Sequence, residues 1–99
     1  MSRTPEALLD EADACHDDDP PRAAAVLRQL DLAALPPGRL PGVAFLLNHV
    51  LGEKLGAWPE AHKLFDALLR ASGDPPPPAL FRQAAAAARL AGEIGRAHV

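Results

Sequence analysis

A group of residues that could bind a metal ion or activate a thiol lies near the start of the chain. Cys15 and His16 are followed directly by Asp17, Asp18 and Asp19. Thiolate, imidazole and carboxylate groups are the usual protein ligands of zinc. Consecutive aspartates point in different directions, however, and before a helix they interact favourably with its positive end. We therefore expect these acids to serve the helix that follows and to hold no metal ion.

Two further histidines, His49 and His62, could meet if the helices that carry them pack together. The sequence identifies no carboxylate or other orienting group beside them, so the pair defines neither a zinc site nor a general base. The chain also lacks a glycine-rich phosphate loop, a nucleophile elbow and an HExxH motif. We expect no catalytic residue, no metal and no cofactor, and a protein that is not an enzyme.

The composition narrows the class of protein further. A chain of 99 residues is long enough for one small domain. A net charge of -3 and a pI near 5.7 argue against a protein that wraps nucleic acid. The single cysteine cannot form an internal disulfide, which fits a reducing compartment. Because no secretory signal and no membrane-spanning run is apparent, we expect a cytoplasmic protein with no membrane partner.

Proline and glycine divide the sequence into five expected helices. The first runs from Thr4, as its cap, to about residue 16, and the second from about residue 20 to 34. The third covers about 41–55 and ends at Gly56, the fourth begins at Trp58 and runs toward Gly73, and the fifth covers about 79–91. A stiff connector of four prolines, residues 75–78, precedes the last helix. No segment shows the alternation of a β-strand, so the expected class is all-α.

The large side chains of the expected core are few. We expect Phe45, Trp58, Phe65 and Phe81 to be buried, because they supply most of the bulk in an alanine-rich sequence. Ala61 is expected where two helices touch, since a larger side chain there would overpack the pair.

Two internal similarities suggest a repeated unit. The segments 55–61 (LGAWPEA) and 91–97 (AGEIGRA) match at a shift of 36 residues, which also relates Phe45 to Phe81. A shift of 38 superposes four apolar positions of the second helix on those of the fourth: Ala23, Val26, Leu27 and Leu30 on Ala61, Leu64, Phe65 and Leu68. Such periods are typical of stacked helix pairs. Chance is the alternative, because all amphipathic helices share this spacing.

The central unit resembles the tetratricopeptide repeat. Phe45, Gly56, Trp58, Ala61 and Phe65 follow the family's order of a large apolar residue, glycine, an aromatic residue, alanine and phenylalanine. The third unit is similar in part, with Phe81, Gly92, Ile94 and Ala97. The first departs from the pattern, because Asp18 and Pro20 replace the glycine and the aromatic residue.

This resemblance implies a fold of about five helices in antiparallel pairs, stacked as a short right-handed solenoid. The copies would cover about residues 4–35 and 41–73, with a partial copy at about 78–99. Another small helical bundle is the alternative. The function implied is that of a non-enzymatic adaptor or scaffold that binds a protein or peptide.

In tetratricopeptide-like folds the first helix of each pair lines a concave groove. The resemblance places seven candidate partner-binding residues there: Val43, Leu46, Val50, Lys54, Arg82, Ala86 and Arg89. Arg82, Arg89 and Arg96 recur every seven residues, so they would form one stripe on a helix. A groove that is both apolar and cationic suits a peptide with hydrophobic anchors and an acidic group. Solubilising surface charges are the simpler interpretation.

A self-associating module is the second hypothesis. The last unit stops with its second helix barely begun, which leaves an apolar face of Ala84, Ala88, Ala91 and Ile94 to be covered by the fourth helix, by a partner or by a second copy of the chain. A nucleic-acid partner would depend on the arginine stripe alone.

Overall fold

The computed structural model of the protein describes residues 4–73 and 77–97, with side chains as far as residue 93. Within these ranges there are α-helices and no β-strand, which confirms the all-α class. The α-helices are α1 (Pro5–Cys15), α2 (Pro20–Leu27), α3 (Leu40–Leu46), α4 (Trp58–Ala71) and α5 (Pro78–Ala97). A π-helical stretch, η3 (Leu47–Lys54), continues α3 directly, and two short 3₁₀ turns, η1 (Leu32–Ala34) and η2 (Pro37–Arg39), join α2 to α3.

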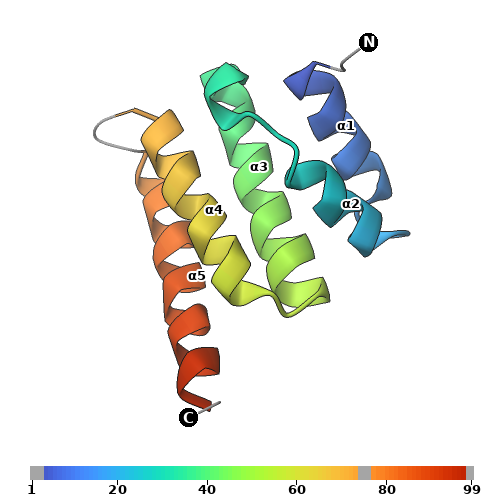
Figure 1. The fold of residues 1–99 in the computed structure, drawn as a ribbon. Helices are drawn as coiled ribbons and strands as arrows, with labels where there is room; N and C mark the ends of the chain where they lie inside the picture. Colours follow the sequence, from blue (N-terminus) through green and yellow to red (C-terminus); the bar gives the residue numbers. More distant parts are fainter. Residues whose placement is uncertain (1–3, 74–76, 98–99) are drawn as a thin grey trace.

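The long helix formed by α3 and η3 lies in the middle of the molecule (Figure 1). The pair α1 and α2 packs on one side of it, and α4 followed by α5 packs on the other. The molecule measures 45 × 34 × 19 Å. Because a helix with its side chains is about 10 Å wide, the smallest dimension corresponds to roughly two helix widths. The helices therefore form a flattened stack around the central one.

The helix starts follow the caps expected from the sequence. Thr4 Oγ1 accepts a hydrogen bond of 3.1 Å from the backbone N–H of Ala7, which caps α1. Asp19 Oδ1 accepts one of 3.2 Å from the backbone N–H of Arg22, which caps α2. A proline follows each cap, where no N–H is needed. These side chains satisfy donors that the first helical turn leaves free.

The end of η3 also follows the expectation from the sequence. Gly56 has a φ of 67°, in the left-handed region that favours glycine, and its N–H donates to the carbonyl of Gly52 at 2.8 Å. The chain then turns sharply, so that α4 begins at Trp58 and runs back beside η3.

Two expected boundaries were wrong. The second helix ends at Leu27 rather than near residue 34, because Leu32–Ala34 form a separate 3₁₀ turn after an extended Asp31. This break lets the chain return so that Leu35 reaches the core. The fifth helix continues past residue 91 to Ala97. A glycine inside a helix destabilises the helix by about 1 kcal/mol relative to alanine. The alanine-rich segment before Gly92 favours the helix strongly enough to offset this destabilisation.

The core is built mainly from leucine, valine and alanine. Its largest fully buried side chains are Phe65, Leu40, Leu46, Leu47, Leu51, Leu68, Val43 and Val50. Ala61 is completely buried, as expected for a residue between helices. The expectation that all four large aromatic residues are buried was wrong: Phe45 is 49% and Phe81 60% exposed, and Trp58 is half-buried. The faces of their helices that point toward the core carry leucine and alanine instead.

A close contact joins η3 to α4. Gly52 is buried, and the ring of Trp58 lies directly against its backbone. A Cβ atom at Gly52 would lie less than 3.0 Å from three atoms of this ring. Only glycine therefore fits between η3 and the start of α4 without displacement of the ring.

Arg28 and Glu60 form an ion pair between the ends of α2 and α4. The guanidinium donates from Nε to Oε2 at 2.6 Å and from Nη2 to Oε1 at 2.7 Å. The hydrogen bond from Arg28 lowers the pKa of the Glu60 carboxyl below its ordinary value, and the same bond raises the pKa of Arg28. Because the side chains are 47% and 34% exposed, solvent screens much of the attraction.

Replacing Gly52 by alanine should lower the free energy of unfolding by about 1 to 3 kcal/mol, since the methyl group must push the Trp58 ring away. Urea unfolding followed by circular dichroism measures the change. Gly42→Ala is the matched control, because that helical glycine is exposed with open space around it. The control should be unchanged or more stable by up to about 1 kcal/mol. A Gly52→Ala protein as stable as the wild type would contradict the contact.

Replacing Glu60 by glutamine should lower the free energy of unfolding at pH 7 by about 0.5 to 1 kcal/mol. The carboxyl has a lowered pKa in the folded state, so the stabilisation is present above its unfolded pKa and is lost as the pH falls through the folded one. The difference from the wild type should therefore shrink below about pH 4. Asp66→Asn, an exposed acid on the same helix, is the control. A difference that grows on acidification would contradict this assignment.

Candidate functional site

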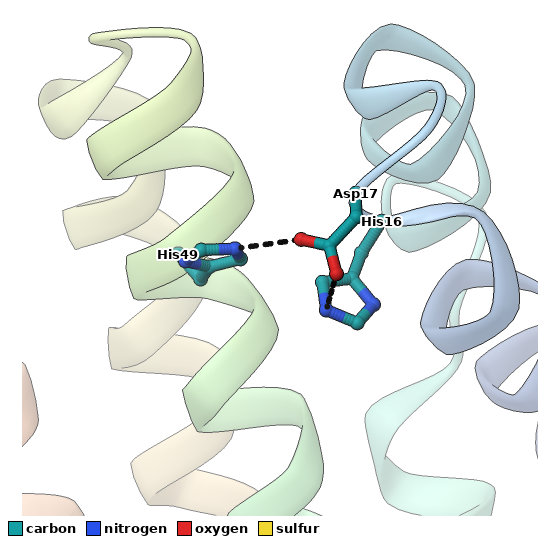
Figure 2. Close-up of side chains that lie close together, drawn as sticks. All are labelled: His16, Asp17 and His49. Carbon is teal, nitrogen blue, oxygen red and sulfur yellow. Dashed lines mark hydrogen bonds and ion pairs between the residues drawn. The ribbon is translucent and has the colours of Figure 1, made fainter.

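Three side chains with metal-binding chemistry meet between α1 and η3 (Figure 2). His16 and Asp17 lie in the turn after α1, and His49 lies in η3, 32 residues from Asp17. Asp17 Oδ2 is 3.4 Å from Nε2 of His16, and Asp17 Oδ1 is 3.4 Å from Nε2 of His49. One donor atom from each residue can be chosen so that all three lie within 4.8 Å of one another. We call these three residues the histidine cluster.

The second nitrogen of each ring also faces an oxygen atom. Nδ1 of His16 lies against the backbone carbonyl of Asp13, in a short hydrogen bond. Nδ1 of His49 is 3.4 Å from Oε2 of Glu53, one helical turn further along η3. Both imidazole rings are therefore held in orientation from behind, with their Nε2 atoms toward Asp17.

Phe45 packs against both rings of the histidine cluster. Its ring stacks on that of His49 with the centroids 5.3 Å apart and meets the edge of His16 at 5.9 Å. The imidazoles themselves are 5.4 Å apart. Their side chains are only 20% and 23% exposed, whereas Asp17 is 70% exposed. One side of the cluster is thus covered by an aromatic ring and the other is open to water.

This arrangement corrects two expectations drawn from the sequence. His49 approaches His16 rather than His62, and it has carboxylate neighbours in Asp17 and Glu53. Of the three consecutive aspartates, only Asp19 caps α2, while Asp17 turns toward the histidines. Nothing in the sequence relates the turn after α1 to a residue 32 positions later, so this site could not be found without the tertiary structure.

Cys15, the other candidate of that segment, is not part of the histidine cluster. Its thiol is half-buried and faces the carbonyl of Ala12 on its own helix at 3.8 Å.

A second candidate site is a cleft of about 430 Å³ on the other side of α3 and η3. Its walls come from the end of α2, from η1, from the central helix and from α4: Leu27, Leu30, Asp31, Leu32, Ala33, Val43, Leu47, Leu64, Ala67, Arg70 and Ala71. Nine of these residues are apolar, and the two charged ones, Asp31 and Arg70, are exposed. We call this hollow the apolar cleft.

The seven residues expected to bind a partner do not form one accessible groove. Leu46 and Val50 are 1% and 0% exposed and belong to the core, which corrects the expectation for these two. Val43 is also buried, but it contributes to the floor of the apolar cleft. The remaining four are exposed: Lys54 on η3, and Arg82, Ala86 and Arg89 on α5. Arg96 and Ile94 lie outside the described side chains.

A smaller hollow of about 170 Å³ lies between α4 and α5. It is lined by His62, Asp66, Leu69, Phe81, Ala84, Ala85 and Ala88. Phe81 projects beside it with 60% of its surface exposed, and Nδ1 of His62 is buried without a hydrogen-bond partner in the described part of the chain. The expected apolar face of α5 is partly covered by α4, since Ala84 is buried and Ala88 half-buried.

Comparisons with known proteins add no family to this description, because no family model, no curated protein and no solved structure matched the chain. Among the described helices, none combines the length and the apolar character needed to cross a membrane.

Proposed function

We propose that the protein is a non-enzymatic interaction module that binds a partner protein or peptide through the apolar cleft. The observation that carries this proposal is a cleft of about 430 Å³ with an apolar floor and charges only at its rim. Binding energy in protein interfaces is concentrated where a large side chain fills such a desolvated pocket. The apolar cleft is lined so that it can hold one or two such side chains, which then serve as anchors.

The rim of the apolar cleft indicates the chemistry of the partner. Asp31 and Arg70 are exposed at its edge, so a basic and an acidic side chain next to the anchor would each find an opposite charge. Small-molecule sites usually place several polar groups inside the pocket to fix orientation. Here the polar residues of the lining stand at the rim, which favours a peptide segment with a leucine or phenylalanine anchor.

A tetratricopeptide-like pairing of the helices is part of the same proposal. Some positions related by the shifts of the sequence agree in burial, since Phe45 and Phe81 are both exposed and Ala23 and Ala61 are both buried, whereas Leu30 is half-buried and Leu68 is buried. The right-handed solenoid and the division into copies at 4–35, 41–73 and 78–99 stay predictions. A cytoplasmic location, suggested by the single cysteine, is also proposed here.

Peptides selected from a random library on the immobilised wild-type protein should share a large apolar residue flanked by charge. Their affinity should fall by about tenfold or more in Ala33→Trp, which places a bulky ring at the exposed edge of the apolar cleft. Ala86→Trp, an equally exposed substitution on α5, should bind as the wild type does. Isothermal titration calorimetry measures both affinities, after circular dichroism has shown that the variants are folded.

The two tryptophan variants distinguish peptide binding in the apolar cleft from peptide binding in the groove expected from the sequence. Loss of affinity in Ala86→Trp alone would move the peptide site to the exposed face of α5. Equal binding by all three proteins, or a library that yields no binding peptide, would contradict the proposal that the apolar cleft binds peptides.

Self-association through α5 is a second candidate function, favoured by the small hollow between α4 and α5. Phe81 projects next to a hollow lined by small alanines, so a two-fold axis could place the Phe81 ring of each copy in the hollow of the other. A group from the second copy would also reach the buried His62 nitrogen that lacks a hydrogen bond.

In this case light scattering should give twice the chain mass of 10.4 kDa at micromolar concentration. Phe81→Glu should return the protein to the monomer, because a carboxylate does not fit an apolar hollow. Phe45→Glu, at the other exposed phenylalanine, is the matched control and should stay dimeric. A wild-type protein that is monomeric at every concentration would exclude this function and leave the peptide-binding proposal intact.

A further inference from the structure

We propose that the histidine cluster binds one divalent transition-metal ion, with zinc as the best match to its donors. Two imidazole nitrogens and one carboxylate oxygen form a three-ligand set that leaves a fourth position open. Imidazole donors suit zinc, copper and nickel better than magnesium or calcium, which prefer oxygen. The site is independent of the peptide-binding proposal, because none of its residues lines the apolar cleft.

The Nδ1 atoms of the two rings both face oxygen atoms. Nδ1 of His16 faces the carbonyl oxygen of Asp13, and Nδ1 of His49 faces a carboxylate oxygen of Glu53. Both of these oxygens can only accept a hydrogen bond. In the neutral tautomer with its proton on Nδ1, each imidazole carries a free lone pair on Nε2.

The Nε2 atoms of both rings face the carboxylate of Asp17. Each Nε2 lies 3.4 Å from an oxygen of Asp17, which is itself an acceptor when ionised. His49 Nε2 and Asp17 Oδ1 form a hydrogen bond when Nε2 carries the proton, and in the Nδ1 tautomer the converging electron pairs repel one another. A cation bound by all three side chains turns this repulsion into coordination.

The distances also suit a small tetrahedral ion. Zinc binds nitrogen and carboxylate oxygen at about 2.0 to 2.2 Å, so neighbouring ligands of a tetrahedral ion lie roughly 3.3 to 3.6 Å apart. The separation of 3.4 Å from Oδ2 of Asp17 to His16 and that of 3.4 Å from Oδ1 to His49 each fall in this range, so either oxygen is placed to share an ion with one histidine. The remaining donor distances, up to 4.8 Å, would have to shorten through rotation of the exposed Asp17 carboxylate and of the half-buried imidazoles.

The surroundings of the rings are those of a metal site. Histidine ligands usually donate their second N–H to a carbonyl or a carboxylate, which fixes the ring and raises its basicity. The Asp13 carbonyl is hydrogen-bonded to Nδ1 of His16, and the Glu53 carboxylate lies 3.4 Å from Nδ1 of His49. Phe45 covers the rings on one side, and the exposed Asp17 leaves the fourth position accessible to water.

A bound ion would join two parts of the chain that are far apart in sequence. His16 and Asp17 come from the turn between α1 and α2, and His49 from η3. An ion that binds only the folded arrangement stabilises it by mass action. The melting temperature should therefore rise with the concentration of zinc.

Zinc titration of the full chain, freed of metal by a chelator, tests the proposal. Isothermal titration calorimetry should show one zinc ion per chain, with affinity at least about tenfold weaker in Asp17→Asn and in His49→Gln. Asp18→Asn and His62→Gln are the matched controls, since neither residue belongs to the cluster. Nitrogen NMR of the imidazole rings should show zinc-dependent shifts of Nε2 in His16 and His49 and none in His62.

The outcomes distinguish a specific zinc site from adventitious binding of zinc at the surface. Circular dichroism is used first to show that every variant is folded, so that a loss of zinc binding cannot be attributed to unfolding. Absence of saturable binding at one ion per chain would overturn the proposal. The same follows if the cluster variants bind zinc as tightly as the wild type, or if His62→Gln weakens binding equally. Zinc binding in the cleft variant Ala33→Trp should equal that of the wild type, which keeps this test separate from that of peptide binding.

Discussion

The contact between the Trp58 ring and the backbone of Gly52 is the constraint on which the arrangement of the helices depends. It occurs where η3 gives way to α4, just after the chain has reversed at Gly56. With no side chain at Gly52, the first turn of α4 can approach η3 closely enough for Ala61 and Phe65 to be fully buried. The position of α5 follows, because α5 packs mainly on α4.

The central helix therefore contributes residues to two candidate sites on different faces. Toward α1 and α2 it presents Phe45 and His49, which complete the histidine cluster. Toward α4 and the 3₁₀ turn η1 it presents Val43 and Leu47, which form the floor of the apolar cleft. Its remaining apolar side chains are buried, which keeps both faces fixed relative to each other. The two proposed sites therefore share one helix and use different faces of it.

Ion pairs at the surface join neighbouring helices to one another. Arg39 donates to Asp10 at 2.5 Å, Arg22 to Glu11 at 2.8 Å, and Arg28 to Glu60 at 2.6 Å. Each pair joins residues at least 11 positions apart, so the pairs fix the tertiary arrangement rather than single helices. Each contributes modestly, because exposed pairs are screened by water. The buried leucines and alanines supply most of the stabilisation, as expected for a core that excludes charged side chains among the described residues.

The all-α class, the starts of α1, α2 and α4, and the turn at Gly56 could be predicted from the amino-acid sequence. These depend on local chemistry: a capping side chain, a proline at the first position, or a glycine with positive φ acts within a few residues. Which aromatic residues are buried, where the second helix ends, and the contact between Asp17 and His49 became known only from the folded arrangement. These depend on how distant segments pack, and the periodicity of a helix shows its apolar face without showing which neighbour will cover it.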